Sequence, residues 1–422
     1  MIAPVIRKRV AVTGIGAITP IGTGVRSFWE GVRTGRRGVR PLSRFDASTF
    51  RTRIAGEISD FDPAAFFTAR RSNRMDRFGH LSIAASHLAL QDSGLRIGAG
   101  LDAVAETDLG VMIGSALGGV PGAEPDHASF LAAGIRSVPP SLAIRVFAGA
   151  GACNVALAFG ARGPVIGNSN SCASGSIAIG EAYRSIRDGE SIAVIAGGVE
   201  APLAPLTFGA FTVIKAMSTA NENPSAASRP FDARRDGFVM AEGAAILILE
   251  EMAHAVKRDA RIYAELSGYA STNDAFHMTA PEPQGRDSSR AMRLAIRNAG
   301  LTSEEIEVVN AHGSSTVLND RTETMAIKDV LGERARRVPV SGTKGLHAHA
   351  LGASGAMEAA IACLTISDGF VPSTANLDHP DPECDLDYVP GMGRSQTVRT
   401  VLSNSFGFGG TNACLLFQAV TG

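Results

Sequence analysis

Residues 169–189 read SNSCASGSIAIGEAYRSIRDG, a loop that ends in small residues and continues into a helical pattern. Residues 344–369, KGLHAHALGASGAMEAAIACLTISDG, have the same form in the second half of the chain. A cysteine stands before the helix in the first copy and a histidine in the second. Chance similarity between two helices rich in Ala and Gly is the alternative interpretation. A true repeat predicts two copies of one βα unit that bring two reactive side chains together.

Short apolar stretches alternate with helical patterns on both sides of this repeat. Strands separated by helices predict an α/β architecture in which parallel or mixed sheets are covered by helices. No Pro/Ser-rich linker divides the chain, and the best boundary follows residue 257, giving halves 1–257 and 258–422. The segment 9–22 is predicted to be a strand that runs into a loop, and further strands are predicted at 109–115, 192–198, 244–250, 306–313 and 398–410.

The first of these strands, in RVAVTGIGAITPIG, contains a G-x-G pattern at Gly14 and Gly16. A dinucleotide-binding turn needs a third glycine three residues later, and Thr19 stands there. We therefore interpret the pair as a strand end that needs tight turns, and not as a nucleotide site.

The composition is that of a globular protein with balanced charge. The 422 residues are 45% hydrophobic, and 40 Lys and Arg against 41 Asp and Glu leave a net charge of −1. This balance disfavours nucleic acid or a membrane surface as a charge-driven partner. A chain of this length buries a sizeable core and corresponds to two or three domains, or to one duplicated unit.

Five cysteines occur without a CxxC pair, so neither a disulfide framework nor a structural zinc site is predicted. This usage fits a reducing, cytoplasmic compartment. The N-terminal residues do not have the pattern of a signal peptide. The longest apolar stretch, near residues 142–159, is interrupted by Arg145 and glycines and is interpreted as core.

Cys172 is the first candidate for chemistry. It precedes Ala173 and the helical run that starts at Ser174. A thiol at a helix N-terminus faces unpaired N–H groups and the positive end of the helix dipole, which predicts a lowered pKa and a nucleophilic thiolate. Its own N–H could help to form an oxyanion hole. A buried structural cysteine is the alternative, and we prefer it for Cys153, Cys363, Cys384 and Cys414.

Two histidines lie in settings typical of active sites. His312 follows an apolar strand and precedes Gly and hydroxyl residues, and His349 stands just before a helix. Each alone could be a satisfied structural histidine, but with Cys172 they favour a Cys/His/His site. His347 and His349 also have H-x-H spacing, yet no carboxylate or thiol has a recognisable ligand spacing, so no metal is predicted.

Two further stretches have weaker functional signals. The C-terminal SNSFGFGGTNACLLF lacks the GK[ST] of a P-loop, so we expect a mobile or closely packed loop whose N–H groups supply an oxyanion donor. Arg70, Arg71, Arg74 and Arg77 form a basic cluster in TARRSNRMDRFGH. A solvated surface is the usual meaning of such a cluster, but it is also the best candidate for docking an acidic partner.

At this point the chain resembles a known family, the class II β-ketoacyl-acyl-carrier-protein synthases, which include the ketosynthases of type II polyketide systems. The resemblance covers essentially the whole chain. It is strongest in the Cys172 loop and in ASRPFDARRDGFV, VNAHGSST, SGTKGLHAHALGASGAMEA and NSFGFGGTN. It implies a thiolase fold, in which two similar halves form a five-layer α-β-α-β-α sandwich.

The resemblance also implies the activity, a decarboxylative Claisen condensation with malonyl-acyl carrier protein that gives a 3-oxoacyl carrier. It implies no metal or organic cofactor, because the phosphopantetheine arm belongs to the acyl carrier protein. The implied dimer is a homodimer or a heterodimer with a chain-length-factor-like subunit.

The motif positions imply roles for individual residues. Cys172 corresponds to the acylated nucleophile, His312 and His349 to the paired histidines, and Lys344 and Glu358 to a supporting polar pair. Asp320 and Glu323 fall where the family keeps acidic residues. The remaining positions are Phe408 as gate and oxyanion donor, Ser314 and Thr316 at the pantetheine arm, Leu117 at the acyl pocket, and Arg70, Arg71 and Arg74 at the carrier-docking face.

Several positions depart from the family pattern. Asn170-Ser171 replace Thr-Ala before the nucleophile, and His347-Ala348 replace Thr-Gly before the second histidine. These changes leave the reaction type in place and bear on the acyl substrate, its chain length and its pathway. Two alternatives remain: a non-condensing chain-length-factor-like partner, against which Cys172 argues, and a CoA-dependent thiolase, against which the two histidines argue.

Overall fold

The computed structural model describes residues 7–68, 72–100 and 102–420. The first half of the chain contributes strands to the main sheet in the order β8-β7-β9-β10-β1, and the two-residue strand β2 (Gly22–Thr23) pairs with the end of β1. β7 pairs in parallel with β8 and β9, whereas β10 pairs antiparallel with β9 and β1. The strands are β1 (Val10–Thr19), β7 (Leu109–Gly114), β8 (Val165–Asn168), β9 (Ala193–Glu200) and β10 (Gly243–Glu251).

The second half repeats this arrangement with the order β13-β12-β16-β17-β11. β12 is parallel to β13 and β16, and β17 is antiparallel to β16 and β11. The expected alternation of strands and helices therefore produces two mixed sheets of the same topology. These strands are β11 (Ala264–Asn273), β12 (Val308–Asn310), β13 (Val340–Ser341), β16 (Thr400–Gly407) and β17 (Thr411–Gln418).

The two sheets join edge to edge through a short contact. Val10–Val12 of β1 pair with Ala264–Leu266 of β11, whereas the pairing of β1 with β10 extends from Val10 to Ile18. The predicted boundary after residue 257 falls between α9 (Met252–Lys257) and β11. That boundary stays a prediction.

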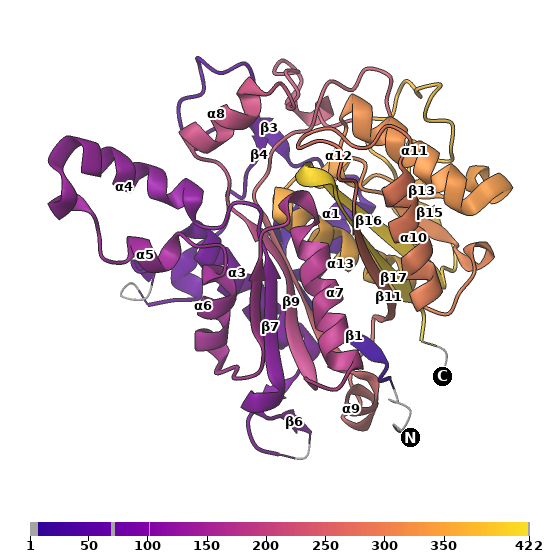
Figure 1. The fold of residues 1–422 in the computed structure, drawn as a ribbon, viewed down its shortest axis with the longest axis horizontal. Helices are drawn as coiled ribbons and strands as arrows, with labels where there is room; N and C mark the ends of the chain where they lie inside the picture. Colours follow the sequence, from indigo (N-terminus) through magenta and orange to yellow (C-terminus); the bar gives the residue numbers. More distant parts are fainter. Residues whose placement is uncertain (1–6, 69–71, 101, 421–422) are drawn as a thin grey trace.

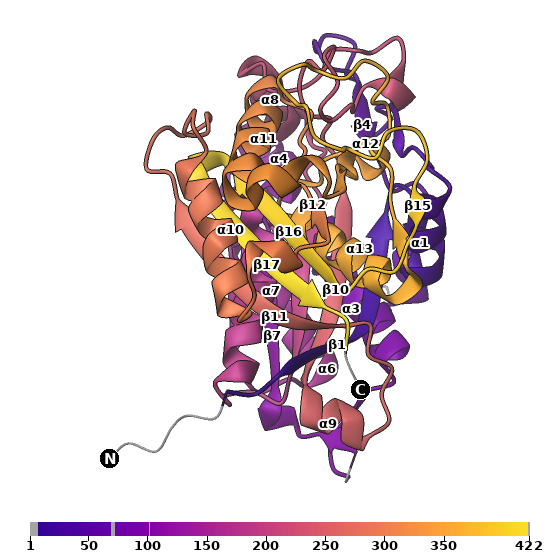
Figure 2. The ribbon, with the colours of Figure 1, turned by 90° about the vertical axis from the view of Figure 1, so that its right-hand side faces the viewer.

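Helices cover both faces of each sheet, and Figure 1 shows the succession of layers from left to right. α3 (Arg77–Ser93) and α6 (Ala150–Phe159) lie outside the first sheet, and α10 (Arg286–Asn298) and α11 (Val317–Leu331) lie outside the second. Between the sheets lie α7 (Ser174–Arg187) and α13 (Ser354–Asp368), which contact each other and both sheets. Figure 2 shows the second sheet and its covering helices from the side. The five-layer thiolase fold is confirmed.

The glycines of the first strand have a different role from the one expected. Gly14 and Gly16 lie inside β1, whose ten residues are all buried, and not at a turn after it. A Cβ at Gly14 would lie 2.4 Å from the Ala89 carbonyl oxygen, and one at Gly16 would lie 2.0 Å from that of Ala85. The missing side chains let α3 approach the strand, so the predicted strand end is wrong.

The repeated segment is a repeat in three dimensions. A 3₁₀ turn, η4 (Ser171–Ala173), leads into α7, and a second one, η8 (Leu351–Ala353), leads into α13. Ser171 and Leu351, the first residues of the two turns, have positive φ angles of 52° and 39°. The residue equivalent to Cys172 is therefore Gly352, and His349 lies three positions before it.

The remaining helices and strands are peripheral. On one side α4 (Val120–Ala133) and α5 (Leu142–Arg145) extend beyond α6, and α8 (Pro205–Val213) lies above the first sheet (Figure 1). No helix among the described residues combines the length and the apolar character needed to cross a membrane. The others include α1 (Gly24–Arg33), β3 (Val39–Pro41), β4 (Ile54–Gly56) and α12 (Lys344–His347).

Candidate active site

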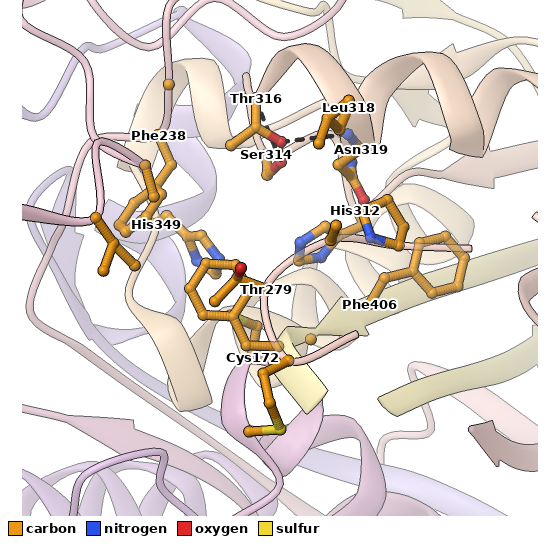
Figure 3. Close-up of a pocket in the computed structure, with 18 of the residues that line it drawn as sticks. Cys172, Phe238, Thr279, His312, Ser314, Thr316, Leu318, Asn319, His349 and Phe406 are labelled. Atoms are coloured by element: carbon orange, nitrogen blue, oxygen red, sulfur yellow. Dashed lines mark hydrogen bonds between the residues drawn. The ribbon is translucent and has the colours of Figure 1, made fainter. Parts of the chain in front are cut away.

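A cavity of about 350 Å³ opens where the two halves meet, at the start of α7. Cys172 lies at its base, and the imidazoles of His312 and His349 lie on either side of the space above the thiol (Figure 3). The two rings have centroids 5.3 Å apart and are nearly perpendicular, at 79°. Cys172 is 140 positions from His312 and 177 positions from His349 in the sequence, and the three side chains nevertheless face one small volume.

Cys172 is held by the turn before α7, as its sequence context predicts. The thiol is buried, and this burial raises the pKa of Cys172 above its usual value. Ser171, the charge of Lys344 and the backbone N–H of Phe408 act in the opposite direction without reversing the shift. The expectation that Cys172 has a lowered pKa is therefore wrong, because loss of hydration on burial outweighs the groups that favour the thiolate.

Backbone amides surround the thiol. The hairpin of β16 and β17 turns through η9 (Phe408–Gly410), where Gly409 has a φ of 80°. A Cβ at Gly407 would lie 3.1 Å from the Cys172 nitrogen, so the absence of a side chain lets this strand end approach Cys172 closely. The N–H groups of Cys172 and Phe408 thus lie beside the thiol, where an oxyanion would develop. The Phe408 ring stacks on Phe211 at 6.4 Å.

A buried lysine sets the state of His312. Lys344 Nζ lies 3.3 Å from His312 Nδ1 and also donates to the His312 carbonyl oxygen and to Glu358 Oε1. An ammonium has no acceptor, so His312 Nδ1 must accept and the ring proton is on Nε2. Burial, and then the charge of Lys344, hold the pKa of His312 well below its usual value. His312 is therefore neutral with Nε2 as its donor.

His349 has a different support. Its Nδ1 lies 2.8 Å from the Ser354 hydroxyl at the start of α13, which is placed to donate a hydrogen bond to it. Its backbone N–H donates to the Val239 carbonyl, and its ring meets the edge of Phe238 at 5.3 Å. Burial, and then the charge of Lys344, also keep the pKa of His349 well below its usual value. The site thus holds two neutral imidazoles.

A buried carboxylate shapes the turn that carries His312. Glu323 on α11 accepts from the N–H groups of His312 and Gly313, each at 2.8 Å, and from Asn404 Nδ2 at 3.1 Å. Burial raises the pKa of Glu323 to about 7. Asp320 accepts from the Ser315 and Phe231 N–H groups and so holds the next part of the same turn. Both carboxyl groups hold the backbone around His312 in place, and neither faces the cavity.

Glu200 has the equivalent role in the first half, and the sequence patterns did not reveal it. Its carboxylate accepts from the N–H groups of Ala116, Leu117 and Gly352 and from the Ser115 hydroxyl, at 2.6–3.2 Å. Burial raises the pKa of Glu200 to about 7. A glutamate that ends an otherwise apolar strand, as in IAVIAGGVE, was the available signal. Ser354 had none beyond its place next to the helix start.

The other predicted residues fall into four groups. Ser314 and Thr316 line the cavity and share a hydrogen bond of 2.9 Å between their hydroxyls (Figure 3). Lys344 and Glu358 are fully buried behind the histidines. Leu117 does not line the cavity; it packs in the apolar cluster around Cys172 that also contains Phe208, Met217, Phe238 and Met240. Arg74 is exposed, and Arg70 and Arg71 lie outside the described residues.

His347 does not form a metal site with His349. Both of its nitrogens have partners within the chain, Thr343 Oγ1 at 3.1 Å and the Ala348 carbonyl at 2.8 Å. In the part of the chain that the structure describes, no group of three or more His, Cys, Asp and Glu side chains is arranged to hold a metal ion. All five cysteines are free thiols, and Cys153 alone among them is exposed.

Together these groups can perform acyl transfer and stabilise an enolate. A thiol beside two N–H donors can attack a thioester and hold the resulting oxyanion. Two neutral imidazoles that present Nε2–H groups can stabilise negative charge on a second carbonyl oxygen in the same cavity.

Comparison with known proteins agrees with this geometry. Residues 7–255 match the model of the β-ketoacyl synthase N-terminal domain, and residues 263–378 match that of the C-terminal domain. A 3-oxoacyl-[acyl-carrier-protein] synthase 2 from Synechocystis is 45% identical over 98% of each chain. The ketoacyl synthase alpha subunit of the tetracenomycin polyketide synthase from Streptomyces glaucescens is 44% identical over 96% of this chain and 95% of its own.

Solved structures give the same result. A type II polyketide ketosynthase, in complex with its acyl-carrier protein and bound to a hexaketide, superposes with a TM-score of 0.89 at 36% identity, over 98% of this chain and 100% of its own. The ishigamide ketosynthase/chain length factor superposes with a TM-score of 0.91 at 35% identity and the same coverage. With its Cys/His/His cavity and its duplicated fold, the chain belongs to the β-ketoacyl synthase family of condensing enzymes.

Proposed function

We propose that Cys172 carries the acyl chain and that His312 and His349 stabilise the enolate formed from a malonyl carrier. In the first half-reaction the sulfur of Cys172 attacks the thioester carbonyl of an acyl carrier. The N–H groups of Cys172 and Phe408 hold the oxyanion. The carrier thiolate then leaves and takes up the proton that the Cys172 thiol has lost.

In the second half-reaction a malonyl carrier enters the same cavity. The bond to its carboxylate breaks, carbon dioxide leaves, and the electron pair of that bond becomes an enolate. The Nε2–H groups of His312 and His349 donate to the enolate oxygen. The enolate carbon attacks the acyl-Cys172 carbonyl, the Cys172 thiolate leaves, and the product is a 3-oxoacyl chain on the carrier. These steps use the substrate's own carboxylate and call for no cofactor.

The observation that carries this proposal is the placement of two neutral imidazoles above a thiol with two adjacent N–H donors. Ser314 and Thr316, whose hydroxyls line the cavity, are proposed to contact the phosphopantetheine arm of the carrier. Acidic acyl carrier protein is the proposed partner, and exposed Arg74 is one candidate contact, with Arg70 and Arg71 on the adjoining segment.

The test is intact-mass spectrometry after incubation with acyl carriers of increasing chain length. We expect an acyl adduct on the wild type that is absent from Cys172→Ala, and a 3-oxoacyl carrier after addition of malonyl carrier. A folded wild-type protein that loads no acyl chain would favour the chain-length-factor-like alternative. Adducts formed from acyl-CoA but from no acyl carrier would favour a thiolase. The accepted chain lengths would separate fatty-acid from polyketide elongation.

We also propose that the chain pairs with a second copy of itself through the open edge of the first sheet. β8 is the last strand of that sheet, and its residues Val165–Gly167 are exposed. The surrounding surface is unusually apolar: Ile135 is 75% and Leu157 80% exposed. Large exposed apolar patches with an unpaired strand edge mark interfaces. The other exposed members are Phe130, Leu131, Ile144, Phe147 and Ile166.

Light scattering of the purified protein measures its oligomeric state directly. We expect a dimer of the isolated chain and a monomer after Leu157→Asp. Cys153 lies one helical turn before Leu157 on the exposed face of α6, so its alkylation rate should rise in the monomeric variant. A wild-type monomer that dimerises only with a chain-length-factor-like subunit would replace the homodimer by a heterodimer. The free thiols fit the reducing cytoplasm proposed for this enzyme.

A further inference from the structure

Ala348 has a backbone conformation that normally requires glycine. Its φ of 61° and ψ of −165° lie in a region that an L-residue with a Cβ rarely occupies. The residue is fully buried and directly precedes His349. Its methyl group packs against Gly56: a Cβ added to Gly56 would lie 3.3 Å from the Ala348 Cβ. The chain thus keeps a strained alanine immediately before one of its two site histidines.

The peptide that joins Ala348 to His349 is held at both ends. Its carbonyl oxygen, on Ala348, accepts from His347 Nδ1 at 2.8 Å. Its N–H, on His349, donates to the Val239 carbonyl oxygen at 2.8 Å. This peptide plane fixes ψ of Ala348 and φ of His349 together. The direction in which the His349 side chain leaves the backbone therefore depends on both hydrogen bonds.

His347 is suited to hold this peptide and to do nothing else. Burial, and then the charge of Lys344, lower the pKa of His347 to about 3, so the ring is neutral during turnover. A carbonyl oxygen can only accept, so the ring proton is on Nδ1, and Nε2 accepts from the Thr343 hydroxyl at 3.1 Å. Neither nitrogen is left to transfer a proton or bind a ligand.

We propose that His347 is a positioning residue: its Nδ1–H holds the Ala348 carbonyl, keeps Ala348 in its glycine-like conformation, and thereby aims the His349 imidazole at the cavity. His347 and Ala348 act as one unit, in which the imidazole compensates for the methyl group beside it. The inference rests on the proposed function, because it is the enolate-stabilising role of His349 that makes its direction matter.

The test is a double-mutant cycle with two separate readouts. His347→Ala is made in the wild type and in an Ala348→Gly background, where the conformation carries no strain. One readout is decarboxylation of malonyl carrier to acetyl carrier, which needs His349. The other is acylation of Cys172, which uses the Cys172 and Phe408 amides. Both are followed by intact mass, and thermal unfolding verifies that each variant is folded.

We expect His347→Ala to slow decarboxylation at least tenfold in the wild-type background and less than threefold in the Ala348→Gly background. Acylation of Cys172 should change less than twofold in both. His347→Asn, whose Nδ2–H reaches a position close to that of the imidazole Nδ1–H, should recover most of the loss. His254→Ala, which removes a histidine on α9 far from the cavity, is the matched control and should change neither rate.

Equal losses in the two backgrounds would overturn the inference, as would a parallel fall of both half-reactions or a normal rate in His347→Ala. Failure of the proposed function is recognised separately. In that case the wild type would not decarboxylate malonyl carrier, or His349→Ala would retain the wild-type rate. The His347 variants are then irrelevant to catalysis whatever their values.

Discussion

The turns before α7 and α13 have the same backbone and differ in what surrounds their central residue. Asn170 and Ala350 have φ/ψ of −99°/44° and −85°/38°, and the next residues, Ser171 and Leu351, both have positive φ. Opposite Cys172 lies an open cavity between two imidazoles. Opposite Gly352 the space is filled, because the Glu200 carboxylate accepts its N–H at 2.9 Å.

This difference shows how a duplicated fold acquires a single site. The repeat supplies the same exposed turn twice, so backbone geometry alone does not choose the reactive half. The two turns differ in the residue that the other half places beside them. His312, which follows β12, lies beside the Cys172 turn, and Ala116, which follows the equivalent strand β7, lies beside the Gly352 turn. The first half contributes the thiol and the second half contributes both imidazoles.

The largest expected effect is the loss of condensation when the thiol is removed from the first turn. Cys172→Ala should lower condensation by at least about 10³-fold while leaving the fold intact, because the residue proposed to form the acyl intermediate is lost. Condensation is measured as 3-oxoacyl carrier by mass spectrometry, and folding by circular dichroism. Substantial remaining condensation would mean that acyl transfer does not pass through Cys172.

Gly352→Ala tests whether the space beside the second turn is filled, in contrast to the open cavity beside Cys172. A Cβ there would lie 2.4 Å from the Ala116 nitrogen and 2.8 Å from Glu200 Oε2, so backbone must move. We expect a loss of about 1–3 kcal/mol in the free energy of unfolding, the usual range for overpacking. Denaturant titration measures it. An unchanged midpoint would show that this turn has the same free space as its counterpart.

Much of the fold and of the candidate site could be predicted from the sequence, and the features that could not be predicted have physical causes. The two helices, the strands and the Cys/His/His set follow from local patterns and from spacing. The pairing of Cys172 with Gly352 could not be predicted, because the repeat carries no reactive side chain at the second position. The pKa of Cys172 was predicted in the wrong direction because burial is a property of the assembled core, and the roles of Gly14 and Gly16 depend on α3.

The two buried glutamates, Glu323 and Glu200, support the equivalent turns of the two halves. Glu323→Gln replaces an acceptor of the His312 and Gly313 N–H groups by an NH₂ group, so the turn that carries His312 shifts. We expect decarboxylation to fall roughly tenfold, at the lower end of supporting-residue effects. Glu200→Gln perturbs the equivalent turn, which carries no reacting group, and should change decarboxylation less than about threefold. Equal effects on the rate would show that both turns matter alike.

The smallest expected effect is a change in how the alkylation rate of Cys172 depends on pH. Because burial raises the pKa of Cys172, less of it is thiolate at pH 7 than for an exposed cysteine, and its alkylation rate should keep rising above pH 9. Exposed Cys153 is the internal reference, and peptide mass mapping after timed iodoacetamide treatment measures both. An alkylation rate of Cys172 that stops rising below about pH 8, under the usual pKa of a cysteine, would restore the lowered pKa expected from the sequence.

The position of β1 in the sheet also has a consequence for biosynthesis. This strand, residues 10–19, pairs with β10 at residues 244–251 and with β11 at residues 264–266. It must therefore wait until more than half of the chain has left the ribosome. At roughly 5–20 residues per second that delay is on the order of 12–50 seconds. During it the face of α3 that receives Gly14 and Gly16 stays uncovered. The first strand to be made thus joins its sheet only after β7, β8, β9 and β10 have been made, and its apolar side chains lack their partners until then.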